Sequence, residues 1–206
     1  MIKVGLVGIG PWGRNYIRTI KEIPGIEFGW ICSPHREFDE DAPRGCKFTH
    51  DYTDLLEDKE TNAIIISTPP STHYELTRNA LVSGKDVLVE KPMTLFSEES
   101  LGLHKLSEKE KRVLMVGHIY LYNPAIQKLK KIIEEGELGN LLYFFSYRGN
   151  PKPSREDISV IWDFAPHDIS LINYITGHLP ISVRAEGRKF LDSKIENLVN
   201  ISLNYP

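Results

Sequence analysis

A glycine-rich segment near the start of the chain constrains its fold more than any other feature. Gly8, Gly10 and Gly13 directly follow the apolar run 2–7 and precede a helical pattern at 14–23. In a strand–turn–helix unit, the first glycine of a G-x-G-x-x-G motif allows a tight turn and the second lets the backbone approach a pyrophosphate. The third lets helix and strand pack closely. The spacing predicts a dinucleotide-binding turn, and the alternative is a glycine-rich turn that binds no ligand.

Strand and helix patterns alternate along the first part of the chain. Short apolar or β-branched runs predict buried strands, and amphipathic segments between them predict helices. This alternation is typical of the α/β class, with a doubly wound parallel sheet covered by helices. The expected strands are 2–7, 26–32, 63–67, 87–90 and 113–116, and the expected helices are 14–23, 53–57, 71–83 and 97–111.

The pattern changes after Gly117. No helix directly follows the aromatic strand expected at 142–148, so the later strands are expected to form a largely antiparallel sheet. We therefore divide the chain into a Rossmann domain, 1–118, and an incomplete α+β substrate domain, 119–206. In this second part we expect helices at 124–135 and 163–176, strands at 142–148, 183–187 and 198–205, and a loop at 150–157.

Composition excludes several classes of function. The 25 basic and 28 acidic residues are interspersed and leave a net charge of −3, which predicts neither a nucleic-acid partner nor an anionic membrane partner. No apolar stretch reaches the length of a transmembrane helix. The two cysteines, Cys32 and Cys46, form no close-spaced pair, so we expect no metal site and no disulfide, and a cytoplasmic location.

The residues that follow the second expected strand bear on the choice between NAD and NADP. An acidic residue about twenty positions after the glycine motif usually binds the ribose 2′-hydroxyl of NAD. Here Ser33 occupies that position and Arg36 follows it. A hydroxyl with a nearby arginine suits a 2′-phosphate, so either NAD or NADP is expected, with a slight preference for NADP. The alternative is that Arg36 is a solvated surface charge and Ser33 accepts either ribose.

Other residues are candidates for the cofactor site because they follow strands at the edge where ligands bind. Thr68, Pro69 and Pro70 are expected beside the nicotinamide ribose. Trp12 either covers the pyrophosphate or packs against the protein, and His73 either lines the pocket or caps a helix. The complete candidate set is Gly8, Gly10, Pro11, Trp12, Gly13, Ser33, Arg36, Thr68, Pro69, Pro70, His73, Glu90 and Lys91.

Three residues are candidates for catalysis. Lys91 follows a strand, where its ammonium could stabilise negative charge on a substrate oxygen. Asp163 and His167 are four residues apart and share one face of the predicted helix. The imidazole could accept a hydroxyl proton, while the carboxylate could orient it, hold a second hydroxyl or cap the helix. Candidate substrate contacts are these three residues with Asn123, Arg148 and Arg155; arginine suits a diphosphate, although loop arginines are more often solvated.

Four segments together resemble the Gfo/Idh/MocA oxidoreductases, a family that includes glucose–fructose oxidoreductase and inositol dehydrogenase. They are the glycine motif, the run Ser-Thr-Pro-Pro-Ser-Thr-His at 67–73, Glu90-Lys91-Pro92, and Asp163 with His167. The resemblance covers essentially the whole chain and implies oxidation of a sugar-like secondary alcohol by NAD or NADP. In that family the matching lysine is catalytic and its bond to proline is often cis, so we predict a cis Lys91-Pro92 bond.

The second half resembles the branch that oxidises UDP-linked amino sugars or their uronic acids at C3. The segments that carry this are Gly117-His118, Tyr122-Asn123-Pro124-Ala125, Arg148 and 162–168. A free-sugar or inositol dehydrogenase is the alternative enzyme. Family members are considerably longer, so a truncated, non-catalytic dinucleotide-binding module is the alternative from another class. We also expect a homo-oligomer.

Overall fold

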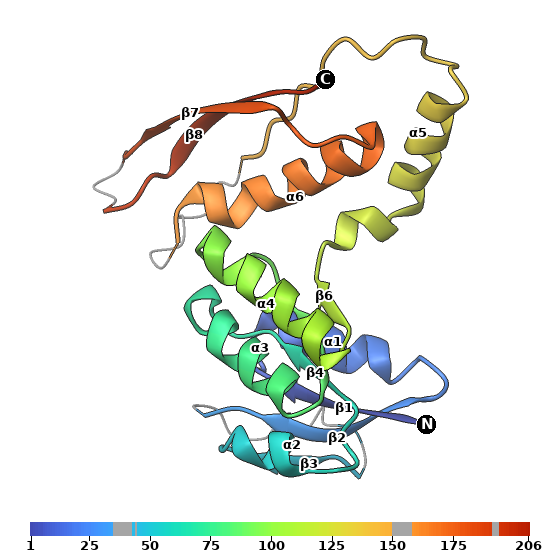
Figure 1. Cartoon of the computed structure of the whole chain (residues 1–206), viewed down its shortest axis with the longest axis vertical. Coiled ribbons are helices and arrows are strands. Elements are labelled where there is room, and N and C mark those ends of the chain that lie inside the picture. Colours follow the sequence, from blue (N-terminus) through green and yellow to red (C-terminus); the bar gives the residue numbers. More distant parts are fainter. Residues whose placement is uncertain (35–42, 44, 150–157, 191–193) are drawn as a thin grey trace. The chain divides into compact units, whose positions relative to one another are not determined.

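The computed structural model describes residues 1–34, 43, 45–149, 158–190 and 194–206. These residues form two compact units, Met1–Gly117 and His118–Pro206. Each unit is described by itself below and is drawn in Figure 1.

Unit 1 is built on a six-stranded sheet in which every neighbouring pair of strands is parallel. The strand order is β3-β2-β1-β4-β5-β6, so the direction of winding reverses between β1 and β4. Ligands of open α/β sheets bind beside the carboxyl ends of the strands at such a reversal. The strands are β1 (Ile2–Val7), β2 (Ile26–Cys32), β3 (Lys47–Thr49), β4 (Ala63–Ile66), β5 (Asp86–Val89) and β6 (Leu114–Val116).

Helices cover both faces of this sheet (Figure 1). They are α1 (Pro11–Ile20), α2 (Thr53–Glu57), the 3-10 turn η1 (Pro70–Thr72), α3 (His73–Val82) and α4 (Ser97–Glu110). The parallel connections expected from the alternating pattern are confirmed, and β3 is an additional short strand that the sequence pattern did not predict.

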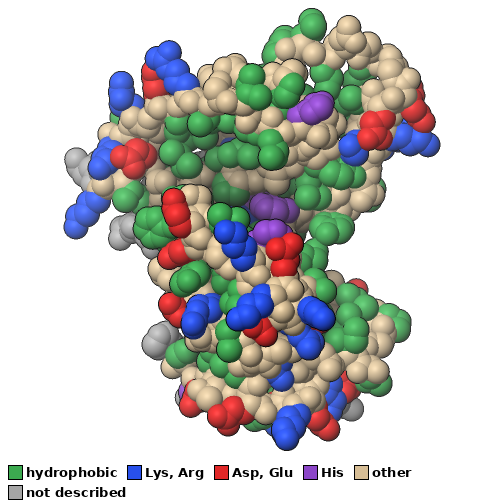
Figure 2. All heavy atoms as spheres, in the orientation of Figure 1, with side chains coloured by type: hydrophobic (Ala, Val, Ile, Leu, Met, Phe, Trp, Pro, Cys, Tyr) green, Lys and Arg blue, Asp and Glu red, His purple; other side chains and the backbone are tan. Residues whose placement is uncertain are grey.

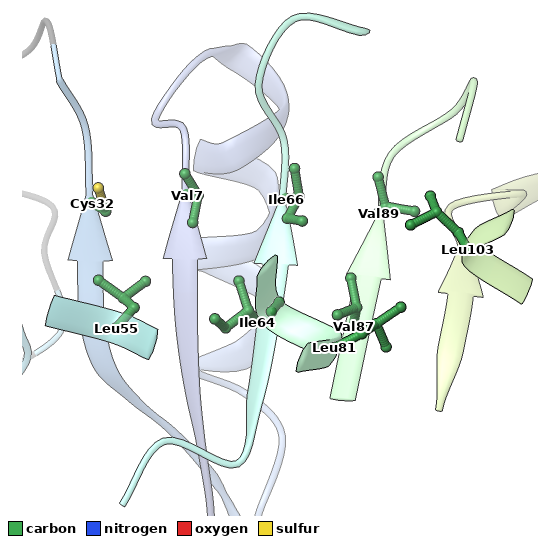
Figure 3. Close-up of a cluster of buried hydrophobic side chains, with 10 residues drawn as sticks. Val7, Cys32, Leu55, Ile64, Ile66, Leu81, Val87, Val89 and Leu103 are labelled. Atoms are coloured by element: carbon green, nitrogen blue, oxygen red, sulfur yellow. The ribbon is translucent and has the colours of Figure 1, made fainter. Parts of the chain in front are cut away.

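Alternation along the strands divides the core into two clusters. Val7 packs in one cluster with Leu55, Leu81 and Leu103 from α2, α3 and α4 (Figure 3). Its neighbour Leu6 packs on the opposite face in a second cluster, which contains side chains of α1. Because successive side chains of a strand point to opposite faces, a continuous apolar run is needed wherever both faces are covered.

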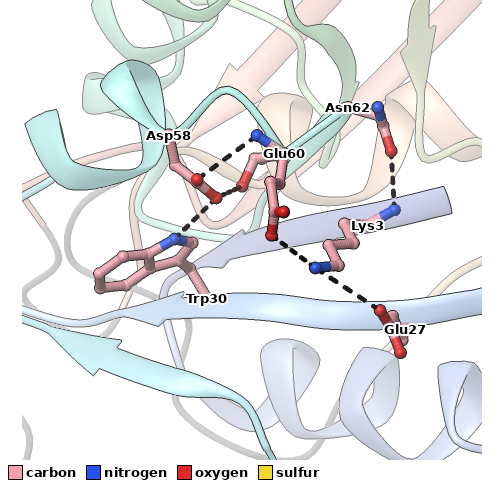
Figure 4. A network of polar contacts seen from close by, with 7 residues as sticks. Lys3, Glu27, Trp30, Asp58, Glu60 and Asn62 are labelled. Carbon is pink, nitrogen blue, oxygen red and sulfur yellow. Dashed lines mark hydrogen bonds and ion pairs between the residues drawn. The ribbon is translucent and has the colours of Figure 1, made fainter.

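A polar network joins the start of β1 to β2 and to the segment before β4 (Figure 4). The backbone N–H of Lys3 donates to Asn62 Oδ1 at 2.8 Å, and Lys3 Nζ lies 2.6 Å from Glu60 Oε2. Trp30 Nε1 donates to Asp58 Oδ2 at 3.0 Å. These contacts fasten the sheet close to the amino ends of β1 and β4, away from the loops that follow their carboxyl ends.

Unit 2 contains two longer helices and a hairpin. Its elements are the 3-10 turn η2 (Ile119–Tyr122), α5 (Pro124–Glu134), α6 (Val160–Thr176), β7 (Ser182–Arg188) and β8 (Leu198–Asn204). The two strands pair antiparallel, with Val183 opposite Leu203. Helix α6 ends at Gly177, whose φ of 70° is the left-handed conformation that favours glycine. The antiparallel sheet expected for this part is confirmed.

The strand predicted at 142–148 is wrong. No described strand pairs with this segment, which lines an open hollow of about 2070 Å³ together with residues of α6 and β8. A strand needs a partner for its backbone hydrogen bonds, and residue pattern alone does not supply one. Tyr143, Phe145 and Tyr147 are each more than 80% exposed. Figure 2 shows further apolar side chains on the visible surface around α6 and the hairpin.

Among the described helices, none combines the length and the apolar character required to span a bilayer.

Candidate active site

The glycine turn after β1 has the geometry that each of its three glycines was expected to provide. Gly8 has a φ of +94°, a backbone conformation that other residues rarely adopt. A Cβ on Gly13 would lie 2.1 Å from the carbonyl oxygen of Gly8, so only glycine permits α1 to pack this closely on the turn. A Cβ on Gly10, by contrast, would meet no atom within 4 Å. The space beside Gly10 is therefore open, at the position where a pyrophosphate is expected to approach the backbone.

Helix α1 begins at this turn, and no described side chain caps its first turn. Gly10 is its N-cap, Pro11 is its first residue, no side chain caps it, and its first turn contains no acidic residue. The first backbone N–H groups of a helix and its dipole favour a bound phosphate. The described residues of the turn therefore fit a dinucleotide. Trp12 lies beside them and is 39% exposed, which leaves it accessible to a ligand.

The loop after β4 supports the glycine turn. Ser67 Oγ donates to the carbonyl oxygen of Gly8 at 2.7 Å, and Ser67 N donates to that of Val7 at 2.9 Å. Thr68 and Thr72 are joined through their hydroxyls at 2.7 Å. Of the residues expected beside the nicotinamide ribose, Thr68 is half-buried, Pro69 is exposed and Pro70 is buried.

His73 is completely buried at the start of α3. Its Nδ1 lies 2.7 Å from the carbonyl oxygen of Pro92, and its Nε2 lies 2.9 Å from that of Thr68. Both ring nitrogens therefore face backbone of the protein itself. His73 thereby joins the loop after β4 to the turn after β5. An influence of His73 on a bound cofactor would therefore act through the positions of these two loops.

Lys91 follows β5 at the same edge of the sheet as the glycine turn. The Lys91-Pro92 peptide bond is cis, which confirms the prediction. The preceding residue, Glu90, is only 5% exposed and accepts a hydrogen bond from the Tyr16 hydroxyl at 2.6 Å. The sequence analysis did not single out Tyr16. Its position on α1, six residues after Gly10, placed it near the motif, but no local signal indicated its partner.

The ribose-specifying position is only partly described. Ser33 is buried, its N–H donates to the carbonyl oxygen of Thr49, and its own carbonyl oxygen lies 2.7 Å from His50 Nδ1. Arg36 lies outside the described residues, so the choice between NAD and NADP stays a prediction.

Helix α6 in unit 2 carries the other two catalytic candidates. Asp163 lies in its first turn, and His167 follows one turn later on the same face. Ser159, not Asp163, is the N-cap, and the N–H of Asp163 donates to the carbonyl oxygen of Ser159. The Asp163 carboxylate is therefore not the helix cap that we considered as one alternative. The ring of Tyr120 from η2 meets the His167 ring edge-on, with centroids 5.0 Å apart.

Arg148 is bound within unit 2. Its Nε donates to Asp168 Oδ2 at 2.6 Å, and its Nη1 donates to the Tyr120 hydroxyl at 3.2 Å. Ser146 Oγ donates to the other oxygen of Asp168 at 2.9 Å. The hydrogen bond that Arg148 donates to Asp168 raises the pKa of the guanidinium. These contacts use the Nε and Nη1 donors of the guanidinium, so a substrate role for Arg148 would have to involve its remaining N–H groups.

Of the two other substrate candidates, the structure describes only Asn123. Asn123 is exposed, and its side-chain oxygen caps α5 by accepting from the N–H of Ala125 at 2.9 Å. Arg155 lies outside the described residues. The described residues contain no group of three or more His, Cys, Asp or Glu side chains arranged to hold a metal ion.

Comparison with known proteins identifies the family. The model described as an oxidoreductase family with an NAD-binding Rossmann fold, GFO/IDH/MocA, matches residues 2–118. The chain belongs to the GFO/IDH/MocA oxidoreductase family. The model of the family's C-terminal domain matches residues 126–206. The resemblance stated from the sequence motifs is thereby confirmed.

Two curated relatives have different named activities. UDP-N-acetylglucosamine 3-dehydrogenase of Acidithiobacillus ferrooxidans is 33% identical over 90% of this chain and 58% of its own length. The scyllo-inositol 2-dehydrogenase (NAD(+)) of Bacillus subtilis is 29% identical over 91% of this chain and 57% of its own. The chain thus spans less than two thirds of the length of these relatives.

Solved structures of the family have the same fold. A protein of Magnetospirillum magnetotacticum, 33% identical, superposes with a TM-score of 0.88 over 98% of this chain and 66% of its own. The myo-inositol 2-dehydrogenase of Lactobacillus plantarum superposes with a TM-score of 0.85 over 99% of this chain and 65% of its own. At 21% identity, the second comparison concerns the fold alone.

Proposed function

We propose that this chain belongs to an NAD- or NADP-dependent dehydrogenase that oxidises a secondary alcohol of a sugar or a cyclitol. The observation that carries the proposal is the glycine turn, with Gly8 at positive φ, open space beside Gly10 and a closely packed Gly13. The family match adds the reaction class, and the names of the two curated relatives supply the substrate class.

A bound nicotinamide would supply the acceptor for a hydride from the alcohol carbon. The residues of the chain have the remaining tasks. The His167 imidazole takes the hydroxyl proton, and the Lys91 ammonium stabilises the oxygen as negative charge develops on it. Asp163, on the same face of α6 as His167, holds a neighbouring hydroxyl or the imidazole.

Dinucleotide binding and turnover test this proposal separately. The intact chain should bind NAD or NADP, measured by calorimetry, and should reduce it when supplied with a panel of inositols, free sugars and UDP-linked amino sugars. Reduction with one class of the panel identifies the substrate. Binding without reduction of any panel member would favour the non-catalytic module instead. Absence of binding to both dinucleotides would overturn the proposal.

Two variants test the catalytic assignments against matched controls. Lys91→Ala and His167→Ala should lower turnover by about 10²–10⁴-fold while dinucleotide binding is retained. Lys109→Ala and His104→Ala change the same residue types on α4, where both side chains are well exposed, and should leave turnover unchanged. Near-normal rates in His167→Ala would remove His167 from the mechanism.

The proposal also includes the cellular location and the oligomeric state of the protein. We place it in the cytoplasm, where its free cysteines Cys32 and Cys46 would stay reduced. We also propose a homo-oligomer, which light scattering on the intact chain would test.

A further inference from the structure

The backbone around Lys91 is held on both sides by side chains that are distant in sequence. On its carboxyl side, the carbonyl oxygen of Pro92 lies 2.7 Å from Nδ1 of the buried His73. On its amino side, the carboxylate of Glu90 accepts from the Tyr16 hydroxyl, 74 residues earlier in the chain. His73 thus holds the backbone on the carboxyl side of Lys91, and the held carboxylate of Glu90 lies on its amino side.

Three contacts confine the Glu90 carboxylate. Tyr16 donates to Oε1 at 2.6 Å, and the N–H of Lys91 donates to Oε2 at 3.3 Å. The third is steric: a Cβ on Gly117 would lie 3.0 Å from Oε1, so the backbone after β6 closes over the carboxylate. Glu90 N also donates to the carbonyl oxygen of Ile66, which anchors its backbone to β4. Of these contacts, only the one from Tyr16 comes from a side chain.

Tyr16 is suited to be a permanent donor. Burial raises the pKa of its hydroxyl, and the hydrogen bond to Glu90 raises it further, so the group keeps its proton at any pH in use. A hydrogen bond to a carboxylate is stronger than one between neutral groups, and inside a protein it fixes direction as well as distance. Tyr16 also lies on α1, the helix that begins at the glycine turn.

We propose that Tyr16 is a positioning residue for Lys91: its hydroxyl fixes the Glu90 carboxylate, which in turn fixes the Lys91 backbone and the direction of its side chain. This rests on the proposed function, in which Lys91 acts on the substrate oxygen. A lysine side chain has four rotatable bonds, so the position of its backbone determines which volume its ammonium reaches. Small misplacements of a catalytic group are costly to turnover.

Tyr16→Phe is the decisive variant because it removes one oxygen atom and keeps the ring. Tyr52→Phe is the matched control. The Tyr52 hydroxyl is also in unit 1 and donates to the carbonyl oxygen of Leu76 at 2.8 Å, but the described contacts of Tyr52 do not include Glu90 or Lys91. Both variants lose one buried hydrogen bond, so a merely structural role predicts similar behaviour from the two.

The primary measurement follows Lys91 without needing activity. Lysines of the intact chain are converted to ¹³C-dimethyl-lysine, and the Lys91 signal is assigned by its disappearance in Lys91→Arg. We expect Tyr16→Phe to shift this signal, while Tyr52→Phe leaves it unchanged. An unchanged Lys91 signal in Tyr16→Phe, or equal shifts in both variants, would overturn the proposal.

A second measurement links the effect to chemistry. Where the chain turns over a substrate, Tyr16→Phe should lower kcat by about 10- to 100-fold, with the dissociation constant of the dinucleotide unchanged. Glu90→Gln, which still accepts from Tyr16, should retain more of the wild-type Lys91 signal than Glu90→Ala. If the wild-type chain binds no dinucleotide, the proposed function fails, whereas the comparison of Lys91 signals still decides the role of Tyr16.

Discussion

A Cβ on Gly13 would lie 2.1 Å from the carbonyl oxygen of Gly8, whereas one on Gly10, three residues earlier, would meet no atom within 4 Å. The two glycines of one motif therefore serve different purposes. Gly13 is required by the fold, whereas no described atom restricts the residue at position 10. On the proposed function, Gly10 is needed for the dinucleotide that would occupy the space beside it.

This difference predicts opposite phenotypes for two alanine variants. Gly13→Ala should lower the free energy of unfolding by about 1–3 kcal/mol, because backbone must shift to admit the methyl group. Gly10→Ala should cost about 1 kcal/mol or less but weaken dinucleotide binding at least about tenfold, or about 1.4 kcal/mol. Denaturant unfolding and calorimetric titration measure the two effects. Unchanged affinity in folded Gly10→Ala would argue against a pyrophosphate at this position.

Asp58 is predicted to contribute to acid stability. Burial tends to raise the pKa of its carboxyl, but hydrogen bonds from Thr61 and Trp30 outweigh burial and hold the pKa below its usual value. A carboxyl whose pKa is lowered by folding stabilises the native state above its unfolded pKa, and this contribution is lost as the pH falls through the folded pKa. Asp58→Asn should therefore reduce stability at pH 7 and flatten the loss of stability below about pH 4.

The control for Asp58 is Glu60, a neighbour in the same network. Glu60 is largely exposed and pairs with Lys3, so Glu60→Gln should change stability by no more than about 0.5 kcal/mol. Urea unfolding at a series of pH values distinguishes the two residues. Equal pH profiles for Asp58→Asn and the wild type would contradict the prediction.

The Arg148–Asp168 pair should matter for unit 2. Both side chains are about three quarters buried, and Ser146 binds the second oxygen of the carboxylate. Asp168→Ala should cost about 1.5–3 kcal/mol, since hydrogen bonds to charged groups are worth that much. A double-mutant cycle with Arg148→Ala should give a favourable coupling energy. The exposed pair Arg184–Glu186 is the control, with an expected coupling of about 0–1 kcal/mol.

Cys32 should be unreactive in the folded protein. It is completely buried, and burial raises the pKa of its thiol to about 11. Because only the thiolate reacts, iodoacetamide at pH 8 should label Cys32 quickly in urea and very slowly in buffer. The labelled fraction is measured by mass spectrometry after digestion. Fast labelling under native conditions would show that the end of β2 opens readily.

The agreement between sequence and structure is closest where the chemistry is local. The spacing of Gly8, Gly10 and Gly13 is a local feature of one strand–turn–helix unit, and the β–α alternation follows from burial of each strand on both faces. The segment 142–148 shows the opposite situation. Its aromatic and branched residues satisfy strand propensity, but a strand also needs a partner, and propensity carries no information about one.

The sequence alone was enough to predict the family, the parallel sheet, the glycine turn and the position of Lys91 after a strand. Each of these depends on short residue spacings or on the period of the hydrophobic pattern. Only the tertiary structure decided that Tyr16 meets Glu90, that His73 faces two backbone carbonyls, and that Arg148 is bound to Asp168. These partners are 5 to 74 residues apart in the chain. Hydrogen bonds need atoms within about 3 Å, and such distances are set by how the strands and helices pack, which no local pattern encodes.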